Sequence, residues 1–155
     1  MAIFQFKESQ IIRAPREEVW QFIATPANLA KITPKHMGFD IQTPDLPSTM
    51  YPGMIIQYKV KPLLGIPLTW LTEITHVEEH KFFIDVQRSG PYAFWHHQHF
   101  LAETAGGVRM DDIVTYQPPF GFLGTIANEL FIRNQLKGIF EYRRKVLDDI
   151  FNRQS

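Results

Sequence analysis

The stretch FWHHQHFLAETAGGVRMDDIVTYQ, residues 94–117, decides the fold class because it contains two alternating runs around a short turn. Residues 94–103 and 108–117 have the two-residue period of half-buried strands. The break at residues 105–107 contains two glycines and is too short for any connection except a hairpin. This stretch therefore predicts two neighbouring antiparallel strands.

The same alternation continues toward the N-terminus, where further strands are separated by short turns. Connections of this length join antiparallel neighbours, so these segments predict a meander. A separate strand opens the chain, and a turn-rich loop over residues 43–53 precedes the meander. The additional strands are expected at residues 3–12, 39–41, 54–60, 68–77 and 82–88.

Helices are predicted in two places. Pro15, followed by acidic residues, marks a helix start after the first strand, and Pro26 starts a second short helix that ends before Pro34. Residues 124–153 have apolar side chains at helical spacing, including Leu136 and Phe140, and predict one long helix.

This order of elements predicts an α+β fold of the helix-grip type. A curved antiparallel sheet of about seven strands would wrap around the long C-terminal helix, with two short helices after the first strand. Such a sheet tends to leave a space beneath the helix, which is filled by side chains or by a ligand.

Composition limits the function classes. The chain has 155 residues, which predicts a single domain over residues 1–155. Sixteen basic and 16 acidic residues balance, so a nucleic-acid partner is not expected. The absence of cysteine excludes disulfides and thiol catalysis. The sequence shows neither a membrane span nor a signal peptide, so a cytoplasmic location is expected.

The loops expected at one end of the meander are unusually apolar. They cover residues 61–67, 89–93 and 117–124, whereas the loops at the other end are polar. Apolar loops can fold over and cap the core, or they can surround the mouth of a cavity for an apolar ligand. In the second interpretation, loops 61–67 and 117–124 make at most a transient membrane contact.

A polar patch is expected on the inner face of the sheet. Trp95, His97 and His99 alternate and share one face. The tight turn at 105–107 predicts that His99 lies opposite Asp112 and that Met110 lies on the same face. A slip of one residue would replace Asp112 by its neighbour Asp111. Glu73 and Asp85 are further candidates whose faces the sequence does not determine.

Three interpretations of this patch remain open. It can be a hydrogen-bond network that braces the sheet, or it can anchor the polar end of a ligand. It can also be reactive, either as an acid/base pair formed by His97 or His99 with Asp112, or as a metal site with two histidines and one carboxylate. Two histidines one residue apart do not supply a third ligand, so neither a metal nor a cofactor is expected. Basic residues 143–145 are interpreted as part of a solvated helix face.

Several motifs resemble the START-like (SRPBCC) superfamily, which includes lipid-transfer domains, birch-pollen-type allergens and polyketide cyclases. The similarity is to bacterial ligand-binding members of unassigned role, and it covers nearly the whole chain. The matching stretches are APREEVW (14–20), TPANL (25–29), GPY (90–92), WHHQH (95–99), DIVTY (112–116), PFGFLG (119–124), QL (135–136) and IFEYR (139–143).

The resemblance implies a helix-grip fold with an apolar cavity between the sheet and the last helix. It implies binding or transport of a small hydrophobic ligand such as a lipid, an isoprenoid or a polyketide-like compound, and an enzyme is the less favoured expectation. The alternatives are a cyclase- or aromatase-like enzyme that uses His97, His99 and Asp112, and an accessory protein with a filled core. The expected ligand-binding residues are Phe82, Glu73, Trp95, His97, His99, Met110, Asp112, Leu136 and Phe140.

Overall fold

A seven-stranded antiparallel sheet forms one layer of the protein in the computed structural model, which describes residues 2–62 and 64–152. The strand order is β1-β7-β6-β5-β4-β3-β2, so the meander runs without a crossover from β2 to β7. This arrangement confirms the predicted helix-grip architecture. The strands are β1 (Phe4–Ile12), β2 (Asp40–Ile41), β3 (Ile55–Val60), β4 (Leu68–Glu78), β5 (Phe82–Ser89), β6 (Phe94–Thr104) and β7 (Gly107–Gln117).

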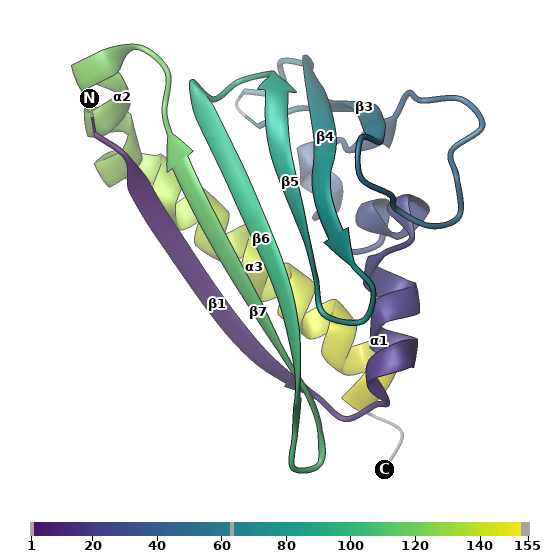
Figure 1. The fold of residues 1–155 in the computed structure, drawn as a ribbon. Coiled ribbons are helices and arrows are strands. Elements are labelled where there is room, and N and C mark those ends of the chain that lie inside the picture. Colours follow the sequence, from purple (N-terminus) through teal and green to yellow (C-terminus); the bar gives the residue numbers. More distant parts are fainter. Residues whose placement is uncertain (1, 63, 153–155) are drawn as a thin grey trace.

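The first strand of the chain pairs with the last. Phe4 lies opposite Tyr116, and the register continues to Ile12 opposite Val108. Because β1 pairs with β7 and the meander continues from β7 to β2, all seven strands form one continuous sheet, with β1 and β2 at its two edges (Figure 1).

Short helices follow β1, as the prolines predict. α1 covers Arg16–Ile23 with Pro15 as its N-cap, and it buries Val19 and Trp20 against the sheet. The second helix is a 3₁₀-helix, η1 (Pro26–Ala30), and is shorter than the predicted segment. A further 3₁₀ turn, η2 (Lys35–Met37), was not expected from the sequence.

The long C-terminal helix crosses the concave face of the sheet (Figure 1). It begins at Gly121, three residues before the predicted start, and includes two π-helical turns. Leu136, Phe140 and Leu147 are its buried apolar contacts in α3. Its segments are α2 (Gly121–Ala127), η3 (Asn128–Ile132), α3 (Arg133–Leu147) and η4 (Asp148–Asn152). Within the described ranges, no helix has the length and apolar character needed to cross a lipid bilayer.

The apolar side chains on the concave face form two clusters. The larger cluster contains Trp20 from α1, Phe83 from β5 and Leu147 from α3. The smaller cluster contains Val114, Tyr116, Leu136 and Phe140. The candidate site lies between these two clusters.

Candidate functional site

Strand register brings two histidines and two aspartates together on the concave face. His99 of β6 lies opposite Asp112 of β7, as predicted, and His97 lies opposite Asp85 of β5. Because alternate residues share a face, the side chains of these cross-strand neighbours converge. The register therefore makes Asp112, and not Asp111, the inward carboxylate.

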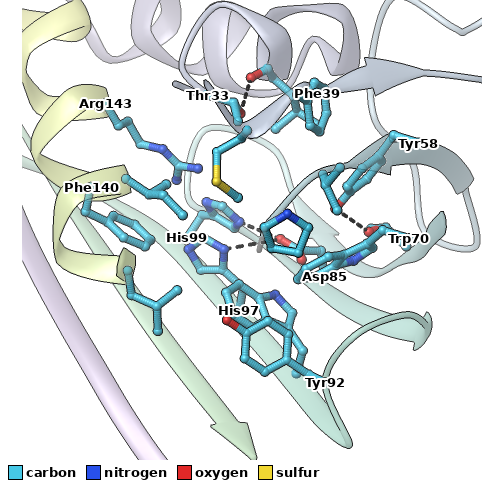
Figure 2. Close-up of a pocket in the computed structure, with 18 of the residues that line it drawn as sticks. Thr33, Phe39, Tyr58, Trp70, Asp85, Tyr92, His97, His99, Phe140 and Arg143 are labelled. Atoms are coloured by element: carbon cyan, nitrogen blue, oxygen red, sulfur yellow. Dashed lines mark hydrogen bonds and ion pairs between the residues drawn. The ribbon is translucent and has the colours of Figure 1, made fainter. Parts of the chain in front are cut away.

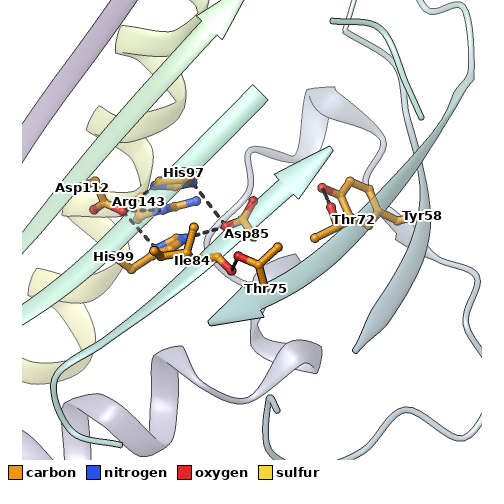
Figure 3. Close-up of polar contacts among 9 residues, drawn as sticks. All are labelled: Tyr58, Thr72, Thr75, Ile84, Asp85, His97, His99, Asp112 and Arg143. Carbon is orange, nitrogen blue, oxygen red and sulfur yellow. Dashed lines mark hydrogen bonds and ion pairs between the residues drawn. The ribbon is translucent and has the colours of Figure 1, made fainter. Parts of the chain in front are cut away.

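The four side chains form a compact buried network (Figure 3). His97 Nε2 lies 2.8 Å from Asp112 Oδ1, and His99 Nδ1 lies 3.1 Å from the same oxygen. His99 Nε2 lies 2.7 Å from Asp85 Oδ2, whereas His97 Nδ1 is 3.7 Å from that atom. The two imidazole rings face one another with their centroids 3.7 Å apart.

Aromatic residues from both apolar clusters enclose this network. Phe83 stacks on His99 with a centroid separation of 3.9 Å. Phe140 contacts His97 edge-on at 5.7 Å. The network therefore joins the larger cluster to the smaller one; His97, His99 and Asp112 are buried, and Asp85 is partly buried.

Arg143 of α3 also points into this region, contrary to the expected solvated face. Its Nη1 lies 3.4 Å from Asp112 Oδ1, and its guanidinium lies 4.7 Å from the centre of the Phe140 ring. Its side chain is only 12% exposed. Positions 136, 140, 143 and 147 have helical spacing, so Arg143 shares the inward face of Leu136, Phe140 and Leu147.

The electrostatics follow from burial and hydrogen bonding. Burial and the neighbouring charge of His99 lower the pKa of His97 to about 4. Burial also opposes a charge on His99, but hydrogen bonds to Asp112 and Asp85 raise its pKa overall. Burial opposes ionisation of Asp112 as well, yet hydrogen bonds from the two histidines and the charge of Arg143 lower its pKa.

A cavity of about 120 Å³ adjoins the network, between the sheet and α3 (Figure 2). Its walls are mainly apolar, and His97, His99, Asp85 and Arg143 form the polar part of its lining. An engineered apolar cavity of about 150 Å³ is large enough to bind benzene. Aromatic and aliphatic wall residues include Met50, Trp70, Tyr92, Trp95, Leu136 and Phe140.

Two hydrogen-bond donors of the cavity lining lack a partner among the described residues. These are Trp70 Nε1 and Arg143 Nε, both of which are buried. By contrast, the Tyr58 hydroxyl, also in the lining, forms a 3.0 Å hydrogen bond with Thr72 Oγ1. A buried donor without an acceptor costs about 1–3 kcal/mol, so an acceptor in the cavity would be stabilised.

The predicted site residues divide into two groups. Trp95, His97, His99, Leu136 and Phe140 line the cavity, and Asp112 lies behind the two histidines. Met110 is buried in the larger apolar cluster and is not part of the lining. Phe82 and Glu73 do not line the cavity either: Phe82 packs on Phe100, and Glu73 pairs with Arg88.

Strand alternation explains the positions of Phe82 and Glu73. Phe83 is buried and lines the cavity, so its neighbour Phe82 must point to the other face of β5. In the same way, Thr72 and Ile74 of β4 line the cavity, which turns Glu73 away from it. Three aromatic lining residues were not predicted. Tyr58 of β3 and Trp70 of β4 could have been found only with the inward faces of those strands known, and Tyr92 lies in the bend between β5 and β6, where strand alternation does not apply.

A surface depression adjoins the cavity between η2 and α3. Gln135 and Ile139 border both spaces. Gln135 Nε2 donates a hydrogen bond to the Pro62 carbonyl, which connects α3 to the apolar loop 61–67. Residue 63 of that loop lies outside the described residues. Gln135 and Ile139 therefore lie between this depression and the cavity.

No family model matches the chain, and no curated protein is similar to it in sequence. Solved structures are similar in fold. Protein CV1439 from Chromobacterium violaceum has a TM-score of 0.70 at 14% identity, over 95% of this chain and 96% of that one. The protein named Ara h 8.0201 has a TM-score of 0.60 at 16% identity, over 96% of this chain and 99% of that one.

The di-domain ARO/CYC protein BexL, from the BE-7585A biosynthetic pathway, has a TM-score of 0.73 at 18% identity. The match covers 99% of this chain and 51% of BexL, so the chain spans about half the length of that protein. Similarity at these identities concerns the fold, and unrelated functions share folds. Together with the sheet order and the terminal helix, these matches show that the chain has a helix-grip fold.

Proposed function

We propose that the protein binds a compact hydrophobic molecule that carries an oxygen acceptor, in the cavity between the sheet and α3. The observation that supports this proposal is an apolar cavity whose lining contains two buried donors, Trp70 Nε1 and Arg143 Nε, without a partner in the described structure. A carbonyl, carboxylate or hydroxyl oxygen would satisfy such donors, while the aromatic walls would hold the apolar body of the ligand.

The size of the cavity narrows the ligand class. About 120 Å³ suits a molecule of roughly one aromatic ring, whereas drug-sized ligands occupy pockets of about 300–1,000 Å³. A long lipid or a polyketide chain would need the cavity to expand between η2 and α3. The presence of this cavity also argues against an accessory protein with a filled core.

A matched pair of ligands tests this proposal. Acetophenone and ethylbenzene have similar shapes, but only acetophenone carries an acceptor oxygen. We expect acetophenone to bind more tightly in calorimetric titrations, by about the tenfold that corresponds to one hydrogen bond of roughly 1.4 kcal/mol. Equal affinities, or binding of neither compound, would contradict the proposed ligand class.

Two tryptophan variants test whether the indole N–H of Trp70 causes the preference for acetophenone over ethylbenzene. Trp70→Phe removes the indole N–H but keeps an aromatic wall, so it should reduce the preference for acetophenone. Trp20→Phe is the matched control because Trp20 lies in the larger apolar cluster and does not line the cavity. Native mass spectrometry of protein purified from its host would then identify the natural ligand as a retained adduct.

A cyclase- or aromatase-like reaction is the second candidate, and one arrangement favours it. His97 borders the cavity, and its Nε2 lies 2.8 Å from the carboxylate of Asp112. A carboxylate that orients an imidazole in this way is a common part of acid/base sites. The similar BexL structure is described as ARO/CYC. Turnover of a polyketide substrate that disappears in Asp112→Asn, with the fold retained, would support this function.

We also propose a transient membrane contact through loops 61–67 and 117–124. Leu64 and Phe120 are 85% and 82% exposed, and Phe122 is 75% exposed. Large apolar side chains grouped in this way are uncommon on a surface that contacts only water. A membrane contact at this end would bring an apolar ligand close to the depression beside η2.

A further inference from the structure

The buried network contains one gap on its cavity side. Three of the four contacts between ring nitrogens and carboxylates are 2.7–3.1 Å long, whereas His97 Nδ1 and Asp85 Oδ2 are 3.7 Å apart. That separation is too long for a hydrogen bond. One ring nitrogen of His97, one of His99 and an Asp85 carboxylate oxygen all lie within 4.8 Å of one another.

Asp112 determines which ring atoms are available in this gap. A carboxylate only accepts hydrogen bonds, so its contacts with His97 Nε2 and His99 Nδ1 place a proton on each of those atoms. On the neutral His97 ring, the opposite nitrogen, Nδ1, then carries a lone pair, whereas His99 Nε2 donates its own proton to Asp85 Oδ2 at 2.7 Å in the metal-free protein. A metal ion that displaces this proton from His99 would meet two nitrogen lone pairs, on His97 Nδ1 and His99 Nε2, beside the Asp85 carboxylate.

This arrangement has the two shells of a protein metal site. Metal-binding histidines usually donate their second ring N–H to a carboxylate, which fixes the orientation of the ring. Here Asp112 would serve both rings, and Arg143, 3.4 Å away, would hold Asp112 in turn. Asp85 would supply the third ligand that the spacing of the two histidines alone does not provide.

We propose that Asp85, His97 and His99 form a binding site for a divalent transition-metal ion, with Asp112 as the carboxylate that orients both histidines. Two imidazoles and one carboxylate suit Zn²⁺, Co²⁺ or Fe²⁺, whereas Mg²⁺ and Ca²⁺ prefer oxygen ligands. The two aspartates would balance the charge of the ion in this buried place. All three ligands line the cavity, so a further coordination position would face it.

Binding requires a small local change. Zn²⁺ lies about 2.0–2.2 Å from nitrogen and oxygen ligands in a tetrahedral site. The 2.7 Å pair of His99 Nε2 and Asp85 Oδ2 must therefore open, and the 3.7 Å pair of His97 Nδ1 and Asp85 Oδ2 must close slightly. The two rings, now tilted by 31°, must open toward the ion by rotation of their side chains. The backbone register already places Asp85 opposite His97, so no strand has to move.

Metal titration of the ligand-free protein tests this inference independently of the proposed function. The protein is first treated with a chelator and then titrated with Co²⁺, and its visible absorption is recorded. We expect one ion per chain and d–d bands typical of nitrogen and oxygen ligands. Asp85→Asn and His97→Gln should abolish the bands, and Asp112→Asn should weaken binding about 10- to 100-fold.

Asp111→Asn is the matched control because Asp111 lies beside Asp112 but pairs with Ser9 and Arg109 outside the network. It should leave Co²⁺ binding unchanged. Binding that persists in both Asp85→Asn and His97→Gln, or no binding to the wild-type chain, would overturn the inference.

Histidine NMR of the wild-type protein gives a second answer that does not depend on how the variants fold. Zn²⁺ should shift His97 Nδ1 and His99 Nε2 as the coordinating nitrogens, with protons kept on the opposite nitrogens. Shifts confined to His36, His76, His80 or His96 would show binding elsewhere and would contradict the proposed site. Loss of acetophenone binding without loss of Zn²⁺ binding would reject the proposed function alone.

Discussion

At the scale of single residues, one carboxylate oxygen of Asp112 is contacted by three basic side chains. His97, His99 and Arg143 all approach its Oδ1, at 2.8, 3.1 and 3.4 Å. The side chain is buried, so water cannot replace a missing partner. The stability of the whole network therefore depends on this one carboxylate.

Replacing the carboxylate by an amide should be costly. We expect Asp112→Asn to lower the free energy of unfolding by about 3–5 kcal/mol, because it leaves buried charged partners without compensation. Urea denaturation measures the change. Asp111→Asn, on the outer face of the same strand, should cost less than about 1 kcal/mol. Equal losses in the two variants would show that the network contributes little to stability.

Two half-buried tyrosines of the cavity lining predict a loss of stability at alkaline pH. Burial raises the pKa of Tyr58 and of Tyr92 well above the usual value of about 10. Above that value the unfolded chain releases these protons and the folded chain keeps them, so the stability present below pH 10 falls as the pH rises. Denaturation at several alkaline pH values should show a shallower fall in Tyr58→Phe and in Tyr92→Phe. An unchanged slope in both variants would contradict the half-buried, neutral state.

At the scale of elements, two glycines of the terminal helix differ in their surroundings. A Cβ at Gly138 would meet no atom within 4 Å. A Cβ at Gly124 would lie 2.1 Å from the Pro119 carbonyl oxygen and 3.0 Å from Pro118. The same substitution therefore has opposite consequences in α2 and α3.

We expect Gly138→Ala to raise the free energy of unfolding by about 0.5–1 kcal/mol, because alanine loses less backbone entropy in a helix. Gly124→Ala should lower it by about 1–3 kcal/mol through overpacking. Thermal unfolding of both variants checks the two signs. A stabilising effect of Gly124→Ala would mean that the turn at Pro118–Pro119 is less tightly packed against the helix.

The strands and part of the site were predictable because tight hairpins fix register. The turn after β6 set His99 opposite Asp112, as expected. Asp85 could not be placed in the same way, because β4 and β5 contain register shifts near Thr72 and His76. An irregularity of this kind changes which residues share a face.

Other features of the site were not predicted, each for a different physical reason. The inward position of Arg143 was present in the spacing from Leu136 and Phe140, but its charge and its basic neighbours favoured a solvated interpretation. Phe82 is half-buried on the outer face of β5 and its neighbour Phe83 is buried on the inner face, although both residues are equally apolar. The volume of the cavity depends on side-chain packing across several elements, which no local pattern contains.

At the scale of the whole molecule, the apolar loops lie at one end of the sheet. The β3–β4 loop, the segment after β7 and α2 all lie at this end of the sheet, and β1 runs from it to the opposite end (Figure 1). Ile11 is the penultimate residue of β1 and therefore belongs to that opposite end. Because the exposed apolar side chains lie at one end, we expect the protein to approach a lipid surface with that end first.

Vesicle sedimentation tests this orientation. We expect the combined change Leu64→Ser and Phe122→Ser to reduce binding to phosphatidylcholine vesicles at least tenfold, since full burial of even one large apolar side chain contributes about 1.5–3 kcal/mol. Ile11→Ser also removes an exposed apolar side chain, which is 48% exposed, but at the other end. Its vesicle binding should match that of the wild type. Equal losses in both proteins would indicate nonspecific adsorption.

The pairing of β1 with β7 has a consequence for biosynthesis. Phe4 needs Tyr116 as its partner, and the side chain of Asn152 bonds to the backbone of Ile11 and of Arg13. Because synthesis begins at the N-terminus, β1 leaves the ribosome long before β7 and the terminal helix, which supply these partners, have been synthesised. Contacts so distant in sequence slow folding. During translation, β1 therefore stays unpaired until β7 has been synthesised. We expect chaperones that bind unpaired strands to act on this nascent chain before its last helix emerges.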